Sequence, residues 1–148
     1  MHAPETGSVD AVTFASVWGP RLLRFYFLLC ANRKIAEAVT FRTLSEIIRS
    51  RRTAAMEISR LAVETARYMP ADGTKAYDAI ARAVSSLPKG QGCVIALSYG
   101  MDLALGEIAE ATQTSLVETK SLFTDGVARL HQLLFVNEQR LATFRQAP

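Results

Sequence analysis

The stretch that decides the fold runs from Leu87 to Leu134 and reads LPKGQGCVIALSYGMDLALGEIAEATQTSLVETKSLFTDGVARLHQLL. Its apolar residues recur at helical spacings, and no part of it alternates apolar and polar residues between Gly/Asn turns as hairpins do. We expect a short apolar helix over 91–99 with Gly100 as its C-terminal cap. A second short helix is predicted over 105–112 and a long third helix from Ser115 onward.

The long third helix has a recognisable beginning and one apolar face. Ser115 and Glu118 have the spacing of a capping box, in which the serine side chain accepts a hydrogen bond from the third helical N–H group. The apolar pattern continues to Leu141 and Phe144, so we expect the extra turns to cover the rest of the protein or a partner. Side chains recur along one face at alternating four- and three-residue steps: Leu116, Lys120, Phe123, Val127, Leu130 and Leu134.

The same helical pattern extends upstream to residue 13. The sequence MPADGT, Met69 to Thr74, holds the Pro-Ala-Asp-Gly cluster of the middle of the chain and is the best candidate for a hinge. Pro20 is expected to kink or restart the first helix. The upstream helices are predicted over 13–31, 34–51, 54–68 and 75–86. We therefore predict an all-α fold with two small lobes, 1–68 and 75–148, joined by the hinge 69–74, and with a helix-turn-helix and a long C-terminal helix in the second lobe.

The composition is that of an ordinary globular protein, with 49% apolar and 21% charged residues and a net charge of +3. No basic stretch followed by an apolar core opens the chain, so a secretory signal is not expected. The longest apolar run, Leu22 to Ala31, contains Arg24 and is far shorter than the ~20 residues that cross a bilayer. A cytoplasmic protein with no membrane partner is predicted. Cys30 and Cys93 are expected to be reduced and buried, with one disulfide as the alternative.

Charge is divided unevenly along the chain. Residues 1–68 hold ten Lys/Arg against six Asp/Glu, a net of +4, whereas residues 69–148 hold seven against eight, a net of −1. Residues 86–131 carry three basic against five acidic residues, a net of −2. Neutralisation of phosphates supplies most of the non-specific affinity for DNA, so an acidic helix-turn-helix lacks much of that affinity.

The quoted stretch resembles region 4 of extracytoplasmic-function sigma factors, in which a Leu-Pro pair, an apolar helix, Glu-Ile-Ala-Glu, a small polar turn and a recognition helix follow one another. The corresponding residues here are Leu87-Pro88, Val94 to Leu97, Glu107 to Glu110, Thr114-Ser115 and Lys120-Ser121. Small residues such as Ala109 allow two helices to cross closely. Upstream, Ala36-Glu37 followed by Leu44, Ile47 and Ile48 is similar to the central helix of region 2.

The sequence departs from this family where the family contacts DNA and polymerase. Positions that hold arginines on the family's recognition helix are Leu122, Asp125 and Val127 here. Positions that grip the polymerase clamp in region 2 correspond to Ala38, Phe41 and Arg42. The basic run that normally follows the third helix is missing. In these losses the chain is similar to sigma-like domains that serve as decoys for an anti-sigma factor, although it lacks their receiver domain.

Two groups of residues are candidate binding sites. Arg49, Arg51 and Arg52 form the densest basic patch, which could contact promoter or polymerase or could simply complement the end of a helix dipole. Lys120 and Arg129 are the candidate phosphate contacts of the recognition helix. The candidate partner-binding apolar face consists of Phe25, Phe27, Phe123, Val127, Leu130 and Leu134. Around Trp18, Phe25 and Phe27, stacking on single-stranded bases is the alternative to core packing or a partner face.

No pattern in the sequence indicates an enzyme. A phosphate-binding glycine loop, a nucleophile elbow and a metal-ligand cluster are all missing from it. His131 has no cysteine or second histidine at ligand spacing, and Glu107 and Glu110 have no nucleophile nearby in sequence. We therefore expect no catalytic residues, no metal and no cofactor.

The first expectation for function is a sigma-like regulator of bacterial transcription initiation that acts through protein contacts with an anti-sigma factor or the RNA polymerase core. Helix-in-groove docking is the expected mode. The second is a working extracytoplasmic-function sigma factor that binds core polymerase and promoter DNA. The third is a helical homodimer that retains only the scaffold.

Overall fold

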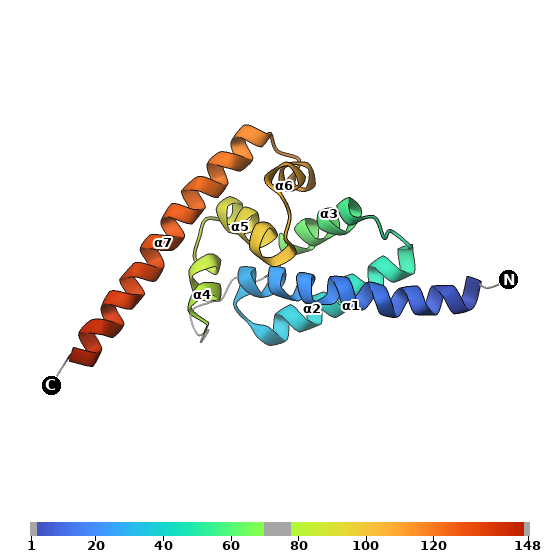
Figure 1. Cartoon of the computed structure of the whole chain (residues 1–148), viewed down its shortest axis with the longest axis horizontal. Coiled ribbons are helices and arrows are strands. Elements are labelled where there is room, and N and C mark those ends of the chain that lie inside the picture. Colours follow the sequence, from blue (N-terminus) through green and yellow to red (C-terminus); the bar gives the residue numbers. More distant parts are fainter. Residues whose placement is uncertain (1–2, 70–77, 147–148) are drawn as a thin grey trace.

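The computed structural model describes the backbone of residues 3–69 and 78–146 and the side chains of residues 11–69 and 78–135. Every regular element in these residues is an α-helix, which confirms the all-α prediction. Figure 1 shows the arrangement, in which the long first and last helices frame the shorter ones. The helices are α1 (Ala3–Cys30), α2 (Arg33–Ser50), α3 (Ala55–Ala66), α4 (Ala79–Ser85), α5 (Lys89–Met101), α6 (Leu105–Thr112) and α7 (Leu116–Gln146).

Local sequence signals place several helix ends correctly. The predicted helix over 105–112 coincides with α6, and Ser115 caps α7 because its Oγ accepts a hydrogen bond from the backbone N–H of Glu118 at 3.1 Å. Asn32 caps α2 in the same way by accepting from the N–H of Ile35 at 3.1 Å. These side chains satisfy backbone donors that have no partner inside the helix.

Two expectations about helix breaks concern Pro20 and Gly100. Of the kink or restart predicted at Pro20, the restart is wrong, because α1 continues through this residue and begins well before residue 13. Gly100 is not the C-terminal cap of the apolar helix, because α5 extends to Met101 and Asp102 adopts the left-handed conformation at φ 57° instead. Proline is tolerated in α1 at an exposed position. Gly100 instead lies where the backbones of two helices come close together.

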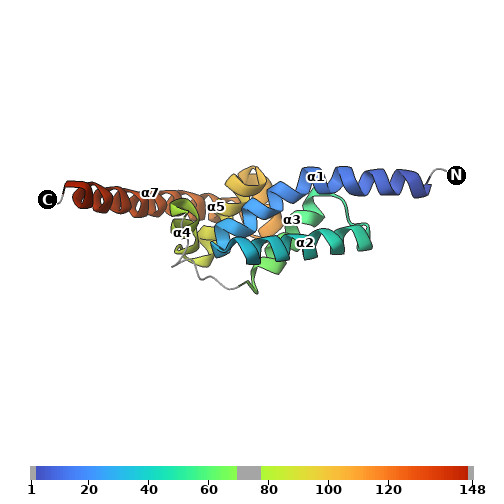
Figure 2. The ribbon, with the colours of Figure 1, turned by 90° about the horizontal axis from the view of Figure 1, so that it is seen from below.

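Helix α1 is the axis of the fold. It packs along α2 and also along α4 and α5, so residues far apart in sequence meet on it. Figures 1 and 2 show α2 beside α1 and α5 crossing α1 near its C-terminal end. Its buried side chains include Leu22, Phe25 and Tyr26, each with no exposed surface. Their position explains why the long apolar run of α1 lies inside the protein.

Both halves of the chain contribute to the same hydrophobic core. One cluster joins Leu22 and Ile47 from the first half with Leu97, Met101 and Ile108 from the second. In addition, α3 packs on α6. The two predicted lobes therefore share one core in this structure. Of the predicted hinge over 69–74, only Met69 lies within the described residues.

The closest approach of α1 and α5 occurs at Gly100. A Cβ atom added there would lie 2.8 Å from the backbone N of Phe25 and 2.9 Å from its Cα. Real Cβ contacts are longer than this, so only glycine lets the two backbones lie so near. The contact is reinforced by Arg24, whose Nε donates to the carbonyl of Gly100 at 3.2 Å. Close packing rather than turn geometry thus requires glycine here.

A buried hydrogen bond fixes α1 against α2. The hydroxyl groups of Tyr26 and Thr43 lie 2.7 Å apart with both residues inside the core. Burial raises the pKa of the Tyr26 phenol and outweighs the opposite effect of this hydrogen bond. The phenol therefore stays protonated, and each buried polar group has the partner that it needs.

Both long helices extend beyond the common core. In Figure 2 the N-terminal part of α1 and the C-terminal part of α7 project from opposite ends of the molecule. Helix α7 packs on α4, α5 and α6 through its earlier turns. The last turns of α7 therefore do not cover the other helices, and their expected contact with a partner stays a prediction.

We expect Gly100→Ala to lower the free energy of unfolding by about 1–3 kcal/mol, because the added methyl group collides with the backbone of α1. Gly106→Ala is the matched control: a Cβ there meets nothing within 4 Å, and the change should raise stability by about 0.5 kcal/mol through lower unfolded-state entropy. Urea unfolding followed by circular dichroism measures both. Equal effects of the two changes would contradict the close-approach explanation.

Candidate partner interface

Helices α6 and α7 are joined by a tight turn over Gln113, Thr114 and Ser115. Gln113 adopts the left-handed conformation at φ 57°, and the N–H of Thr114 donates to the carbonyl of Ala109 at 3.0 Å. The chain therefore leaves α6 and enters α7 without an intervening loop. These residues correspond to the small polar turn that the sequence predicted.

A chain of threonine hydroxyls fixes the angle between these helices. The hydroxyl of Thr114 lies 2.9 Å from that of Thr112 and 2.8 Å from that of Thr119. Thr119 is fully buried and also donates to the carbonyl of Ser115 at 2.9 Å. Thr112 likewise donates to the carbonyl of Ile108 at 2.7 Å, so the single hydroxyl proton of Thr114 serves one of its two neighbours at a time in this half-buried cluster. Sequence reasoning missed it, because three threonines among other polar residues give no periodic signal.

The α6–α7 pair packs against the other helices of the molecule. The carboxylate of Glu107 accepts from the N–H of Ala104 at 2.9 Å and caps the start of α6. Arg60 of α3 lies 4.0 Å from Glu110 of α6, an exposed pair that contributes little to stability. The buried residues Ile108 and Ala109 hold α6 against the core. The pair therefore presents a fixed surface.

This surface is acidic and apolar. Glu107, Glu110, Glu118 and Asp125 are all exposed, so the negative charge counted in the sequence lies on the outside. Val117, in the first turn of α7, is 80% exposed. A helix that reads DNA carries cations and hydrogen-bond donors toward phosphates and bases. The first turns of α7 present carboxylates, hydroxyls and aliphatic groups around a single cation, Lys120.

Lys120 and Arg129 are both exposed, but they do not lie on the same face of α7. They are nine positions apart, which is about two and a half helical turns and roughly 13 Å along the axis. A half-turn offset directs them to opposite sides of the helix. The structure therefore does not bring these two predicted phosphate contacts together.

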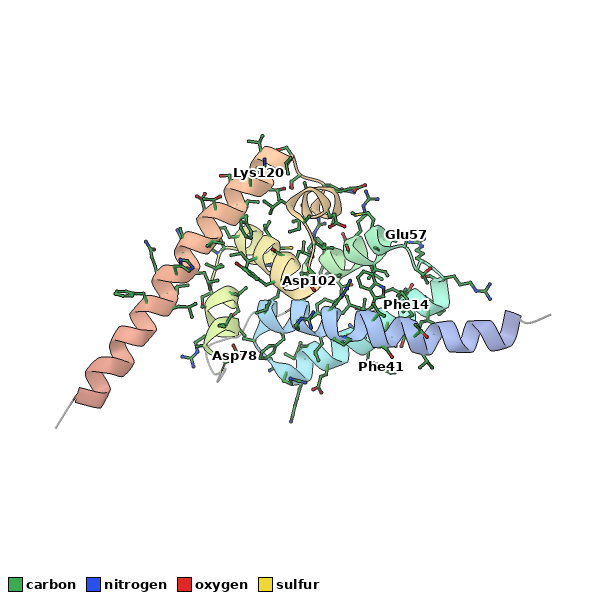
Figure 3. The ribbon with its side chains drawn as sticks, in the orientation of Figure 1. Phe14, Phe41, Glu57, Asp78, Asp102 and Lys120 are labelled. Carbon is green, nitrogen blue, oxygen red and sulfur yellow. The ribbon has the colours of Figure 1, made fainter. Side chains whose placement is uncertain are left out.

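The basic patch of Arg49, Arg51 and Arg52 is exposed at the C-terminal end of α2. The guanidinium of Arg49 hydrogen-bonds to the carboxylate of Glu46 on the same helix, which raises the pKa of Arg49. Arg51 ends the helix in the left-handed conformation at φ 57°. Figure 1 places this end of α2 well away from the start of α7, where Figure 3 labels Lys120. The five predicted cations therefore do not form one site: the arginine patch is separate from α7, and Lys120 and Arg129 lie on opposite sides of that helix.

The predicted apolar partner face is mostly internal. Phe25 has no exposed surface, and Leu130 is also buried, so neither can contact a partner in this arrangement and this part of the prediction is wrong. Phe27, Phe123, Val127 and Leu134 are half-buried and pack against the two core clusters. Their periodicity predicted one apolar face on α7, and helices α4 and α5 pack against that face. Leu141 and Phe144 lie outside the described side chains.

The exposed apolar residues lie elsewhere. On α2, Phe41 is 72% exposed and Ile48 is 41% exposed, one above the other at a seven-residue spacing with Ala38 nearby. We call Ala38, Phe41 and Ile48 the α2 surface; Figure 3 shows Phe41 pointing away from the body. The helical periodicity of the sequence predicts Ala38, Val39, Ile47 and Ile48 on one apolar face of this helix. The structure buries Val39 and Ile47 and leaves Ala38 and Ile48 exposed, so the buried face is narrower than predicted.

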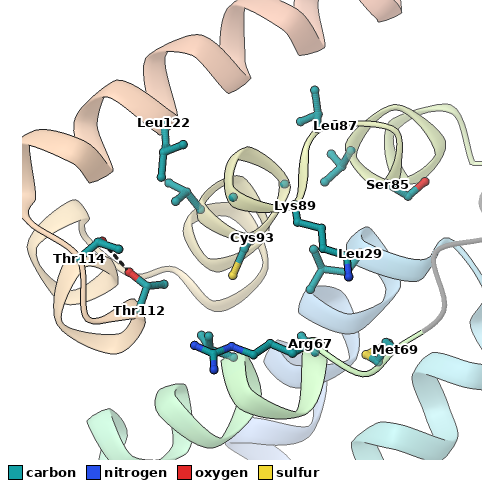
Figure 4. Close-up of a pocket in the computed structure, with 16 residues that line it drawn as sticks. Leu29, Arg67, Met69, Ser85, Leu87, Lys89, Cys93, Thr112, Thr114 and Leu122 are labelled. Atoms are coloured by element: carbon teal, nitrogen blue, oxygen red, sulfur yellow. Dashed lines mark hydrogen bonds between the residues drawn. The ribbon is translucent and has the colours of Figure 1, made fainter.

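A cavity of about 260 Å³ lies between α3 and α5 and extends toward α1, α6 and α7 (Figure 4). Most of its wall is apolar, including Leu29, Val63 and Leu122. Cys93 of α5 points into it, opposite Arg67. Concave, mostly apolar sites of this kind are the usual places for small ligands. Sequence reasoning gave no sign of it, because its wall comes from six helices.

Both cysteines are free thiols in the structure, as the first of the two expectations stated. Burial raises the pKa of Cys93 to about 11, while the charge of Arg67 acts in the opposite direction. Burial also raises the pKa of Cys30, whose Sγ donates to the carbonyl of Asn32 at 3.4 Å. Since the thiolate is the reactive form, both thiols are poor nucleophiles at neutral pH.

No protein-family model matches the chain, and a comparison with curated proteins finds no significant match. Within the described residues, no helix combines the length and apolar character needed to cross a membrane. The described side chains also contain no group of three or more His, Cys, Asp or Glu residues placed to hold a metal ion.

We expect Cys93 to react with iodoacetamide about a hundredfold more slowly at pH 8 than a thiol of ordinary pKa 9.0, because its pKa of about 11 lowers the thiolate fraction. Its rate should keep rising up to pH 11. Peptide mapping by mass spectrometry distinguishes Cys93 from the fully buried Cys30. Arg67→Gln removes an opposing charge and should slow Cys93 further. A rate that levels off near pH 9 would contradict the buried position of this thiol.

Proposed function

We propose that this chain is a sigma-like regulator of bacterial transcription initiation that acts through protein contacts, with an anti-sigma factor as its principal partner. The observation that carries the proposal is the chemistry of the α6–α7 surface. The order of sequence motifs resembles the part of sigma factors that reads promoters, but the exposed residues there suit a protein partner better than DNA.

Electrostatics supports protein contact over DNA contact. Glu118 and Asp125 are exposed on the same side of α7 as Arg129, at seven- and four-residue spacings, whereas Lys120 projects from the other side. Each phosphate contact adds a salt-dependent increment to DNA affinity through counterion release. Lys120 alone on its side supplies little of this increment, and the two carboxylates beside Arg129 repel the phosphate backbone.

The α2 surface is the candidate docking site. An exposed phenylalanine with an aliphatic neighbour on a rigid helix is typical of the anchors that dominate protein interfaces. By the resemblance, Ala38, Phe41 and Arg42 occupy the places that grip the polymerase clamp in sigma factors. Apolar side chains there weaken a polar grip on polymerase and favour an amphipathic helix of another protein.

A working sigma factor is the alternative. It is favoured by the exposed patch of Arg49, Arg51 and Arg52, of which only Arg49 has an ion-pair partner among the described residues. Two unpaired arginines at one end of α2 could contact promoter phosphates or polymerase. Under this alternative the first half of the chain binds DNA more strongly than the α6–α7 pair.

We expect affinity capture with the tagged chain from a bacterial lysate to recover an anti-sigma factor, identified by mass spectrometry. Phe41→Ser should abolish the recovery because it removes the apolar anchor of the α2 surface. Tyr68→Ser is the control, since Tyr68 is an equally exposed aromatic residue (83%) outside this surface. Recovery of core polymerase without an anti-sigma factor would favour the alternative instead.

Fluorescence anisotropy with duplex DNA at low salt tests the alternative directly. A dissociation constant below about 1 µM with a steep salt dependence, lost in Lys120→Ala/Arg129→Ala or in Arg51→Ala/Arg52→Ala, would refute the protein-contact proposal. The two double variants separate the α7 and α2 ends as sites of DNA contact. Light scattering addresses the homodimer: a monomer at tens of micromolar excludes it.

A further inference from the structure

The described residues that line the cavity between α3 and α5 carry charge of one sign. Among them, Arg67 and Lys89 are the only charged residues, and none is a carboxylate. The remaining wall is almost entirely aliphatic, with Leu29, Val63, Val84 and Leu122 among its residues. Apolar walls with a few convergent polar groups are typical of ligand sites.

The two cations differ in what they are free to bind. Arg67 is paired with Glu64 at 3.2 Å, so its charge is largely compensated. No ion pair involving Lys89 is found among the described residues, and this residue is the first of α5, a helix with no acidic residue in its first turn. A cation near the positive end of a helix is unfavourable without an anion beside it. Figure 4 shows the Lys89 ammonium group on the cavity side, near Leu29.

The volume sets the size of a matching ligand. Engineered dry cavities of about 150 Å³ accept benzene, which corresponds to roughly 25 Å³ per carbon atom. At that ratio, the 260 Å³ here would hold about ten carbon atoms. The raised pKa of Cys93 agrees with a wall from which water is excluded.

We infer that this cavity binds a free aliphatic monocarboxylate of medium chain length, with the chain between α3 and α5 and the carboxylate beside Lys89. Burial of the chain supplies the affinity. The ammonium group of Lys89 supplies the selectivity for an anion over a neutral or cationic amphiphile of the same length. The wall contains residues from both halves of the chain, so a bound ligand would contact both halves. This inference does not depend on the identity of the protein partner.

The test is a titration of the full chain with sodium decanoate, with decan-1-ol and decylammonium chloride as probes of the same length. Amide proton–nitrogen NMR shifts report the position of binding, and protection of Cys93 from alkylation gives an independent readout. We expect saturable shifts at cavity residues such as Gly92 and Thr112, protection of Cys93, and decanoate binding that is tighter than that of either other probe.

Lys89→Gln should weaken decanoate binding about three- to tenfold and leave decanol binding unchanged, since it removes only the charge. Lys89 is exposed, so this variant keeps the fold, and Lys120→Gln is the matched control at an exposed lysine that does not line the cavity. Ala66→Phe should fill the cavity and abolish binding of all three probes. Equal affinities for decanoate and decanol, an unchanged affinity in Lys89→Gln, or no saturable shift up to ~1 mM would overturn the inference.

Discussion

The contact between α1 and α5 at Gly100 is the constraint on which the rest of the fold depends. The backbones of Gly100 and Phe25 lie too close for any side chain between them, and Arg24 adds a hydrogen bond to the same carbonyl. This crossing brings α5 into the core formed by α1 and α2. Helices α4, α6 and α7 then pack on α5, so their positions follow from it.

Local signals in the sequence were sufficient to predict the helices, but they did not predict which helices pack against one another. Capping residues such as Ser115 and the periodicity of 105–112 act over a few residues, and the structure agrees with them. Gly100 shows the limit: a glycine near the end of an apolar helix is typical of a cap, whereas its function here depends on a residue 76 positions away with no trace in the local pattern. The predicted apolar face of α2 was likewise too wide, because Ile47 is buried and its neighbour Ile48 is exposed.

The candidate sites, too, could be predicted only in part from the sequence. Charged residues could be placed on the surface from sequence, because the cost of burying a charge puts Arg49, Lys120 and Glu118 outside in almost any fold. Which apolar residues remain exposed could not be predicted, because Phe25 and Phe41 look alike until the neighbouring helices are in place. The cavity, whose wall combines Leu29, Val63 and Leu122 from three helices, has no linear signature at all.

The acidic α6–α7 surface and the apolar α2 surface have different physical characters and lie on different helices. The first is fixed by a hydroxyl network around Thr114 that rigidifies the turn. The second is a regular helix face with Phe41 as its main projection. The fold therefore presents two chemically different areas, and under the proposed function each would be a separate contact area.

The shared use of α1 also affects synthesis of the chain. Leu22, Phe25 and Tyr26 leave the ribosome long before α5, since Arg24 and Gly100 are 76 residues apart. At 5–20 residues per second, that separation corresponds to roughly 4–15 s of translation. During this interval an apolar helix has only α2 and α3 to cover it, so part of its apolar surface stays exposed to solvent until α5 emerges.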